Sequence, residues 1–147
     1  MILTQREFDK MCYSLPEGES CSLPEGTLLV DGHDAYYDYL YRLTWVDPFL
    51  LDYSEKHAAE PLVLSMESTL RYVDWFRSGR MCPPLVAVFH EYERVYKCQN
   101  RRRLLAARAA GVSRIPVFLE VARVREVFGL TKSYPLLHSN FNQALAA

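Results

Sequence analysis

The sequence of 147 residues lacks any apolar run that approaches the length of a membrane-spanning helix. Its first residues, Met-Ile-Leu-Thr-Gln-Arg-Glu, also lack the layout of a signal peptide. Half of the residues are apolar and 24% are charged, which is ordinary for a globular protein, and the length suits one domain with a substantial core. We therefore expect a cytoplasmic protein with no membrane partner.

Cysteine is sparse, and its four positions, 12, 21, 82 and 98, form no Cys-x-x-Cys pair and have no histidines at zinc-finger spacing. Disulfides are not expected in a reducing cytosol, and we predict no metal site. Cys98 has two interpretations. Neighbouring arginines would favour its thiolate, whereas a small buried hydrophobe, the interpretation we prefer, is the commoner role of a free cysteine.

Basic residues are scarce in the first part of the chain, and acidic residues are scarce in the rest. Residues 1–60 contain 4 Lys or Arg against 12 Asp or Glu, a net charge of −8, whereas residues 61–147 contain 13 against 6, a net charge of +7. Either the two parts attract each other within the fold or a homodimer, or the basic part meets a polyanion such as DNA. We accordingly divide the chain into an acidic N-terminal extension (1–60), a core (61–130) and a C-terminal tail (131–147).

Hydrophobic spacing and turn residues predict both helices and strands. The runs 84–89 and 92–97, separated by His90 and Glu91, suggest a hairpin. The predicted helices cover residues 4–13, 35–43, 66–78, 100–111 and 123–128, and the other predicted strands cover 27–30 and 115–121. Together they indicate an α+β fold with a small mixed sheet and flanking helices.

The predicted helix over 66–78 follows Ser65, a plausible N-cap, and stops at Gly79. Helical spacing predicts that its inward face carries Met66, Leu70, Val73 and Phe76. Just before the predicted helix over 35–43, Asp31, His33 and Asp34 offer possible metal ligands, although Asp34 equally suits an N-cap, the role that we favour. The tyrosines at helical spacing within 35–43 are typical of core residues.

The segment Gln99-Asn-Arg-Arg-Arg-Leu-Leu-Ala-Ala-Arg-Ala-Ala-Gly111 carries the strongest functional signal. Asn100 is a candidate N-cap and Gly111 a candidate C-cap, which places Arg101, Arg102 and Arg103 in the first helical turn. Cations at that end oppose the helix dipole, so an anion bound by backbone N–H groups and guanidinium groups would relieve the repulsion. The segment therefore predicts a phosphate site, with Arg108 a turn further on facing solvent. A solvated basic helix start that binds nothing is the alternative.

The order of strand, strand, anion-facing helix and strand across residues 61–121 resembles the ParB/sulfiredoxin-like superfamily. The residues that carry the resemblance are Arg102, Arg103, Leu104, Ala106, Ala107, Gly111 and Ile115-Pro116-Val117, with Pro83-Pro84 opening the first strand. The resemblance implies a ParB/sulfiredoxin-like core and binding of a nucleotide at the arginine segment. In this family the helix before the first core strand borders the nucleotide pocket, which makes Glu67 and Asp74 the candidate catalytic or metal-binding carboxylates.

The chain also departs from the family's pattern. Gln99-Asn100 stands where the family has Asp-Gly or Gly, and Arg101 stands where partition proteins carry a glutamate and sulfiredoxins their catalytic cysteine. Sulfinic acid reduction is therefore not expected, because a guanidinium group cannot replace that nucleophile. Anion binding survives these changes and gains charge from them.

These observations predict a protein that binds a nucleoside di- or triphosphate, with or without magnesium, through Asn100, Arg101, Arg102 and Arg103. If the protein is an enzyme, the resemblance implies a nucleotide hydrolase, a phosphotransferase or a ParB-like nuclease. The alternative is a non-catalytic regulatory module that uses its basic face for weak, non-specific DNA binding or for a protein partner.

Overall fold

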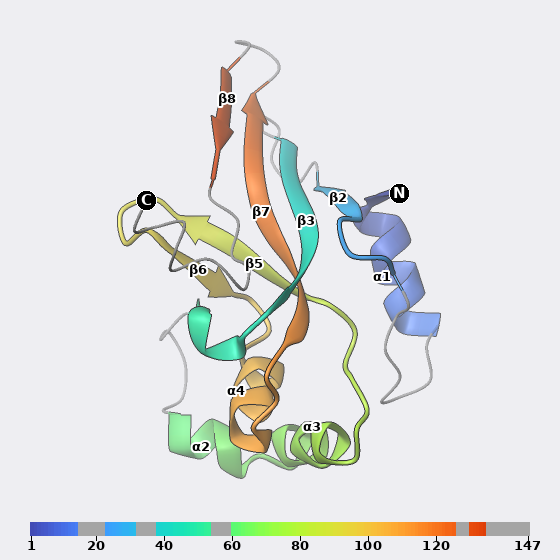
Figure 1. The fold of residues 1–147 in the computed structure, drawn as a ribbon, viewed down its shortest axis with the longest axis vertical. Helices are drawn as coiled ribbons and strands as arrows, with labels where there is room; N and C mark the ends of the chain where they lie inside the picture. Colours follow the sequence, from blue (N-terminus) through green and yellow to red (C-terminus); the bar gives the residue numbers. More distant parts are fainter. Residues whose placement is uncertain (15–22, 32–37, 54–59, 126–129, 135–147) are drawn as a thin grey trace.

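The computed structural model describes residues 1–14, 23–31, 38–53, 60–125 and 130–134, which form one mixed sheet flanked by helices (Figure 1). The strand order is β1-β2-β3-β7-β5-β6-β4, and β8 pairs with β7. The strands are β1 (Ile2–Thr4), β2 (Leu28–Asp31), β3 (Asp38–Val46), β4 (Asp52–Tyr53), β5 (Leu85–His90), β6 (Val95–Cys98), β7 (Ile115–Arg125) and β8 (Leu130–Ser133). The helices are α1 (Gln5–Ser14), the 3₁₀ helix η1 (Pro48–Leu50), α2 (Glu60–Ser65), α3 (Glu67–Arg77) and α4 (Arg101–Ala110). The predicted α+β class is confirmed.

Alternation along β7 divides the core between the two faces of the sheet. Ile115, Val117 and Leu119 belong to a buried cluster with α3, α4, β5 and β6, whereas Phe118 belongs to a second buried cluster with α1, β1, β2 and β3. Phe8 of α1 meets Phe118 edge-on, with ring centroids 5.1 Å apart. Helices α3 and α4 therefore cover one face of the sheet and α1 the other.

The segment from β5 to β7 folds as its sequence predicts. Strands β5 and β6 form the antiparallel hairpin, α4 follows, and β7 returns to lie parallel to β5. Helix α4 ends at Gly111, whose φ of 74° is the left-handed conformation that glycine adopts without a steric penalty. The predicted order of strand, strand, helix and strand is thus confirmed.

The predicted helix over residues 35–43 is wrong, because residues 38–46 form strand β3, the longest partner of β7. Residues 32–37, which include His33 and Asp34, lie outside the described residues. The helix predicted over 123–128 is also wrong within the described part, since β7 continues to Arg125. Ser65 is the last residue of α2 rather than a cap, and Met66 occupies the N-cap position of α3.

The first part of the chain contributes strands to the same sheet as the rest. β3 pairs with β7 along nine registered residue pairs, and β4 pairs with β6. On α3, Val73 and Phe76 are buried as expected, whereas Leu70 is 49% exposed and Thr69 takes a buried place. Ser133 of β8 pairs with Ala122 of β7, so at least this part of the predicted tail is in the sheet. Among the described residues, no helix is long and apolar enough to cross a membrane.

Candidate functional site

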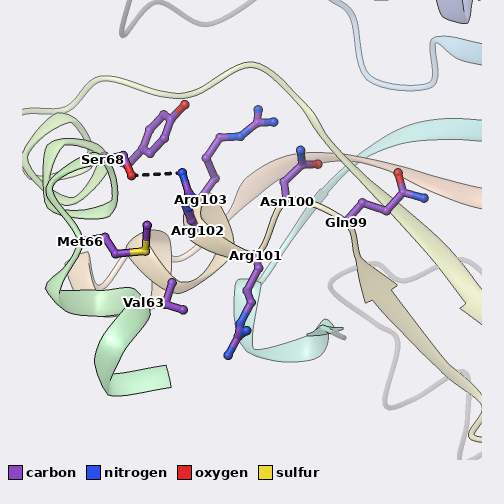
Figure 2. Close-up of a pocket in the computed structure, with 9 residues that line it drawn as sticks. Val63, Met66, Ser68, Gln99, Asn100, Arg101, Arg102 and Arg103 are labelled. Carbon is purple, nitrogen blue, oxygen red and sulfur yellow. Dashed lines mark hydrogen bonds between the residues drawn. The ribbon is translucent and has the colours of Figure 1, made fainter. Parts of the chain in front are cut away.

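A cavity of about 530 Å³ lies between the N-terminus of α4 and the α2–α3 corner. We call it the arginine cavity, because Arg101, Arg102 and Arg103 line it together with Gln99 and Asn100. The other lining residues are Val63, Met66, Ser68 and Tyr72 (Figure 2). All four residues that were predicted to bind phosphate, Asn100 and the three arginines, therefore line one cavity.

Asn100 holds the N-cap position of α4, but its side chain makes no capping hydrogen bond. Its Oδ1 instead accepts from Val86 N of β5 at 3.0 Å, next to the hydrogen bond from Gln99 N to Val86 O. The side-chain amide of Asn100 thus adds one hydrogen bond to β5 beyond the last backbone pair between β5 and β6. The first hydrogen bond of α4 runs from Leu104 N to Asn100 O, so the N–H groups of residues 101–103 have no partner among the described residues.

The three arginine side chains diverge (Figure 2). Arg102 Nη1 donates to Ser68 Oγ at 3.3 Å, Arg103 Nη1 donates to Pro83 O at 3.2 Å, and the guanidinium group of Arg101 lies 4.8 Å from the ring centre of Tyr53. Successive residues of a helix are turned by about 100°, because one turn takes 3.6 residues. Three consecutive arginines therefore cannot converge on one point, and each provides a different wall or rim of the site.

Arg101 differs from the other two arginines in its burial. Its Nε and Nη1 atoms are buried and have no hydrogen-bond partner among the described residues. A buried guanidinium donor without a partner costs free energy, and the contact with Tyr53 compensates only through the face of the ring. The N-terminal end of α4 thus presents backbone donors without a partner among the described residues, an environment that favours an anion, whereas the Arg101 guanidinium group lies over Tyr53 and points away from Arg102 and Arg103 (Figure 2).

The predicted carboxylates do not join the arginines. Glu67 begins α3 with its side chain 93% exposed and 4.0 Å from Arg71, and Asp74 lies exposed further along the same helix. Neither lines the arginine cavity. Within the described parts of the chain, no group of three or more His, Cys, Asp or Glu residues is placed to hold a metal ion.

Arg108 does not face solvent as expected. Its Nε donates to Pro48 O at 3.1 Å and its Nη2 donates to Leu51 O, while its guanidinium group lies over the rings of Phe49 and Tyr53 at 5.4 and 5.6 Å. These carbonyl groups belong to the turn around η1, far from α4 in sequence. Arg108 therefore ties α4 to that turn, a role that a local sequence pattern does not reveal.

Cys98 is buried, as we preferred, and its environment opposes ionisation. Burial raises the pKa of the Cys98 thiol to about 12, although the hydrogen bond from Asn100 N and the nearby Arg103 and Arg108 act in the opposite direction. The neighbouring cations thus fail to produce the reactive thiolate, because desolvation outweighs them.

We expect Cys98 to resist alkylation by iodoacetamide at pH 8 in the folded protein and to react in 6 M guanidinium chloride. Because burial raises the pKa of the thiol, the folded state holds the thiol proton more tightly than the unfolded state does. The contribution of this group to the free energy of unfolding is therefore present below the ordinary pKa of 9.0 and is lost as the pH rises through about 12. Peptide mapping by mass spectrometry measures the label. Equal labelling rates in the two conditions would show that the thiol is accessible.

A second polar cluster lies at the middle of β7. Glu120 is completely buried, and its two carboxylate oxygens accept from Arg123 Nε and Nη2, each at 2.9 Å. Glu120 Oε1 also accepts from Phe89 N at 3.1 Å, just past the last β5–β7 pair, and Tyr96 donates to the Glu120 carbonyl oxygen at 2.7 Å. Local sequence patterns do not reveal this cluster, because Glu120 and Arg123 look like an ordinary surface pair within an apolar run.

Five lining residues of the arginine cavity were also missed: Val63, Met66, Ser68, Tyr72 and Gln99. Four of them come from α2, α3 and the residue between them, and only the packing of these helices against α4 brings them to the arginines. Gln99 could have been recognised from its position directly before the arginines, where the comparison with the family's pattern indicates only the loss of a glycine.

Comparisons with models of known families, with curated proteins and with solved structures found no match.

Proposed function

We propose that the protein binds the phosphate groups of a nucleoside di- or triphosphate in the arginine cavity. The observation that carries this proposal is the union, in one cavity of about 530 Å³, of three arginines with the uncapped N-terminus of a ten-residue helix. A phosphate group there would accept charge-assisted hydrogen bonds from guanidinium and backbone donors together. The volume is that of a small-molecule site.

The resemblance to the ParB/sulfiredoxin-like superfamily supports the same proposal. The order β5, β6, α4 and β7 matches the order from which the resemblance was drawn, and Arg102 and Arg103 begin α4 at the cavity. We limit the proposal to binding, because Glu67 and Asp74, the carboxylates expected to serve hydrolysis or magnesium, do not line the cavity.

Non-specific DNA binding is the second candidate function. It is favoured by the net charge of +7 over residues 61–147. Exposed cations lie at the end of α3, just after it and beyond α4, namely Arg77, Arg80 and Arg114. Such binding should be insensitive to sequence and should fall steeply as the salt concentration rises.

We expect nucleotides to raise the melting temperature of the protein in a panel of inorganic triphosphate, ADP, ATP, CTP and GTP, with and without magnesium. A ligand at one hundred times its Kd adds about 2.7 kcal/mol, which corresponds to roughly 5–10 °C for a domain of this size. Sodium sulfate at equal ionic strength is the control. Shifts no larger than those with sulfate, together with salt-sensitive binding to duplex DNA, would replace the proposal by the second candidate.

A further inference from the structure

Two more cavities continue from the arginine cavity toward α1. The middle cavity, of about 380 Å³, shares Tyr72, Gln99, Asn100 and Arg103 with the arginine cavity. The far cavity, of about 420 Å³, shares four residues with the middle one: Gln5, Asp9, Val86 and Gln99. The three cavities thus adjoin one another, and we call this series the path; it runs from the N-terminus of α4, past the start of β5, to the sheet face that α1 covers.

The path is electrically polar. Its first end carries Arg101, Arg102 and Arg103, whereas Asp9 and Asp31 line the far cavity. Arg123 also lines that far end, but Glu120 engages its Nε and Nη2 atoms. A nucleic acid strand laid along the path would bring phosphates next to Asp9 and Asp31. The charge distribution therefore favours a ligand with phosphates at one end only, which describes a mononucleotide.

The middle cavity has the surfaces that a nucleoside needs. Phe8, Pro83, Pro84 and Val86 supply apolar lining, and Asp9 supplies a carboxylate. Gln5 Nε2 donates to Asp9 Oδ1 at 2.9 Å within α1, and the Asp9 side chain lies at an exposed position beside the cavity. Arg103 borders both this cavity and the arginine cavity. A ligand whose phosphates contact Arg103 can therefore extend its sugar and base into the middle cavity, which Asp9 lines.

We propose that the nucleoside of the bound nucleotide occupies the middle cavity and presents two adjacent hydrogen-bond donors to the Asp9 carboxylate. This inference rests on the proposed phosphate site. Two parts of nucleosides carry such a donor pair: the 2′- and 3′-hydroxyl groups of ribose, and the N1–H and N2–H edge of guanine. Both match an ionised carboxylate, which only accepts hydrogen bonds. Asp9 is thus a binding residue for the end of the ligand opposite its phosphates.

The test is isothermal titration calorimetry of the wild type and Asp9→Asn with inorganic triphosphate, ATP, 2′-deoxyATP and GTP. We expect the wild type to bind ATP or GTP at least tenfold more tightly than triphosphate. Asp9→Asn should remove most of that preference, yet it should not weaken triphosphate binding, because a negative charge has been lost. Glu25→Gln, which removes the same charge at an exposed position outside all three cavities, is the matched control and should keep the preference.

The nucleotide panel identifies the donor pair. A tenfold loss for 2′-deoxyATP relative to ATP indicates the ribose hydroxyl groups, and a tenfold gain for GTP over ATP indicates the guanine edge. Equal affinities of ATP, 2′-deoxyATP and GTP, or a preference over triphosphate that survives in Asp9→Asn, would overturn the inference while leaving the phosphate site intact. Failure of triphosphate and of every nucleotide to bind would overturn both proposals.

Discussion

Replacing Arg123 by methionine is expected to lower the free energy of unfolding by about 3–5 kcal/mol, because it leaves a buried carboxylate without its counter-charge. Glu120 is fully buried, and Arg123 supplies two hydrogen bonds of 2.9 Å to it. Hydrogen bonding to Glu120 raises the pKa of Arg123, so the guanidinium group is charged throughout the accessible pH range. Methionine keeps the apolar stem of the side chain and removes only the charged fork.

Urea denaturation followed by tryptophan fluorescence measures this loss. The control is the double variant Glu120→Gln with Arg123→Met, in which neither of these two positions carries a charge. We expect it to be more stable than Arg123→Met alone, since replacing both members of a buried ion pair by neutral groups is far less costly than removing one. A loss below about 1 kcal/mol in the single variant would show that solvent screens the pair.

The position of Glu120 explains why a charged pair is retained inside this sheet. The register between β3 and β7 shifts at this point, because Leu40 pairs with Ala122 and Tyr41 pairs with Glu120. The β5–β7 pairing ends at Leu119, and Phe89 N of β5 turns to the Glu120 carboxylate instead. The carboxylate thus accepts a hydrogen bond from a backbone N–H group of β5 at the point where β5 and β7 separate. An apolar side chain at position 120 could not accept this hydrogen bond.

The region from β5 to β7 could be predicted because its signals are local. Gly111 ends α4, alternating apolar residues mark β5, and a short turn joins β5 to β6. Strand β3 could not be predicted, because Leu40, Tyr41 and Leu43 fit a helical face and a strand almost equally well. Pairing with β7 decides between helix and strand for this segment. Because β7 lies far along the chain, the residues near β3 carry no sign of that pairing.

The candidate site likewise has features that the sequence predicts and features that it does not. The sequence places Arg101–Arg103 at a helix N-terminus, and this prediction is confirmed. It cannot show that these arginines diverge to Tyr53, Ser68 and Pro83, or that the Asn100 side chain serves β5 instead of capping α4. Both outcomes depend on which elements pack around the helix. Arg108 is the clearest case, because its partners lie in the turn around η1.

Replacing Arg103 by alanine should weaken the binding of inorganic triphosphate and of nucleotides by about 1.5–3 kcal/mol, roughly 10- to 150-fold, because one charge-assisted contact is lost. Arg103 is the arginine common to the arginine cavity and the middle cavity, so it should contact the ligand wherever the phosphate chain continues into the nucleoside. Calorimetric titration at constant ionic strength measures the change.

The matched control is Arg114→Ala, which removes the same charge. Arg114 is exposed and lies outside all three cavities. Arg108→Ala would be unsuitable, because Arg108 binds the carbonyl groups of Pro48 and Leu51 and its loss should destabilise the fold. Arg103 also donates to Pro83 O, so its variant is first compared with the wild type by urea denaturation, where we expect a loss of only about 1 kcal/mol. With both variants folded, Arg114→Ala should bind triphosphate within twofold of the wild type. Equal affinities of Arg103→Ala and Arg114→Ala would mean that general charge, and not a contact at the N-terminus of α4, attracts the ligand, and the phosphate site would have to be abandoned.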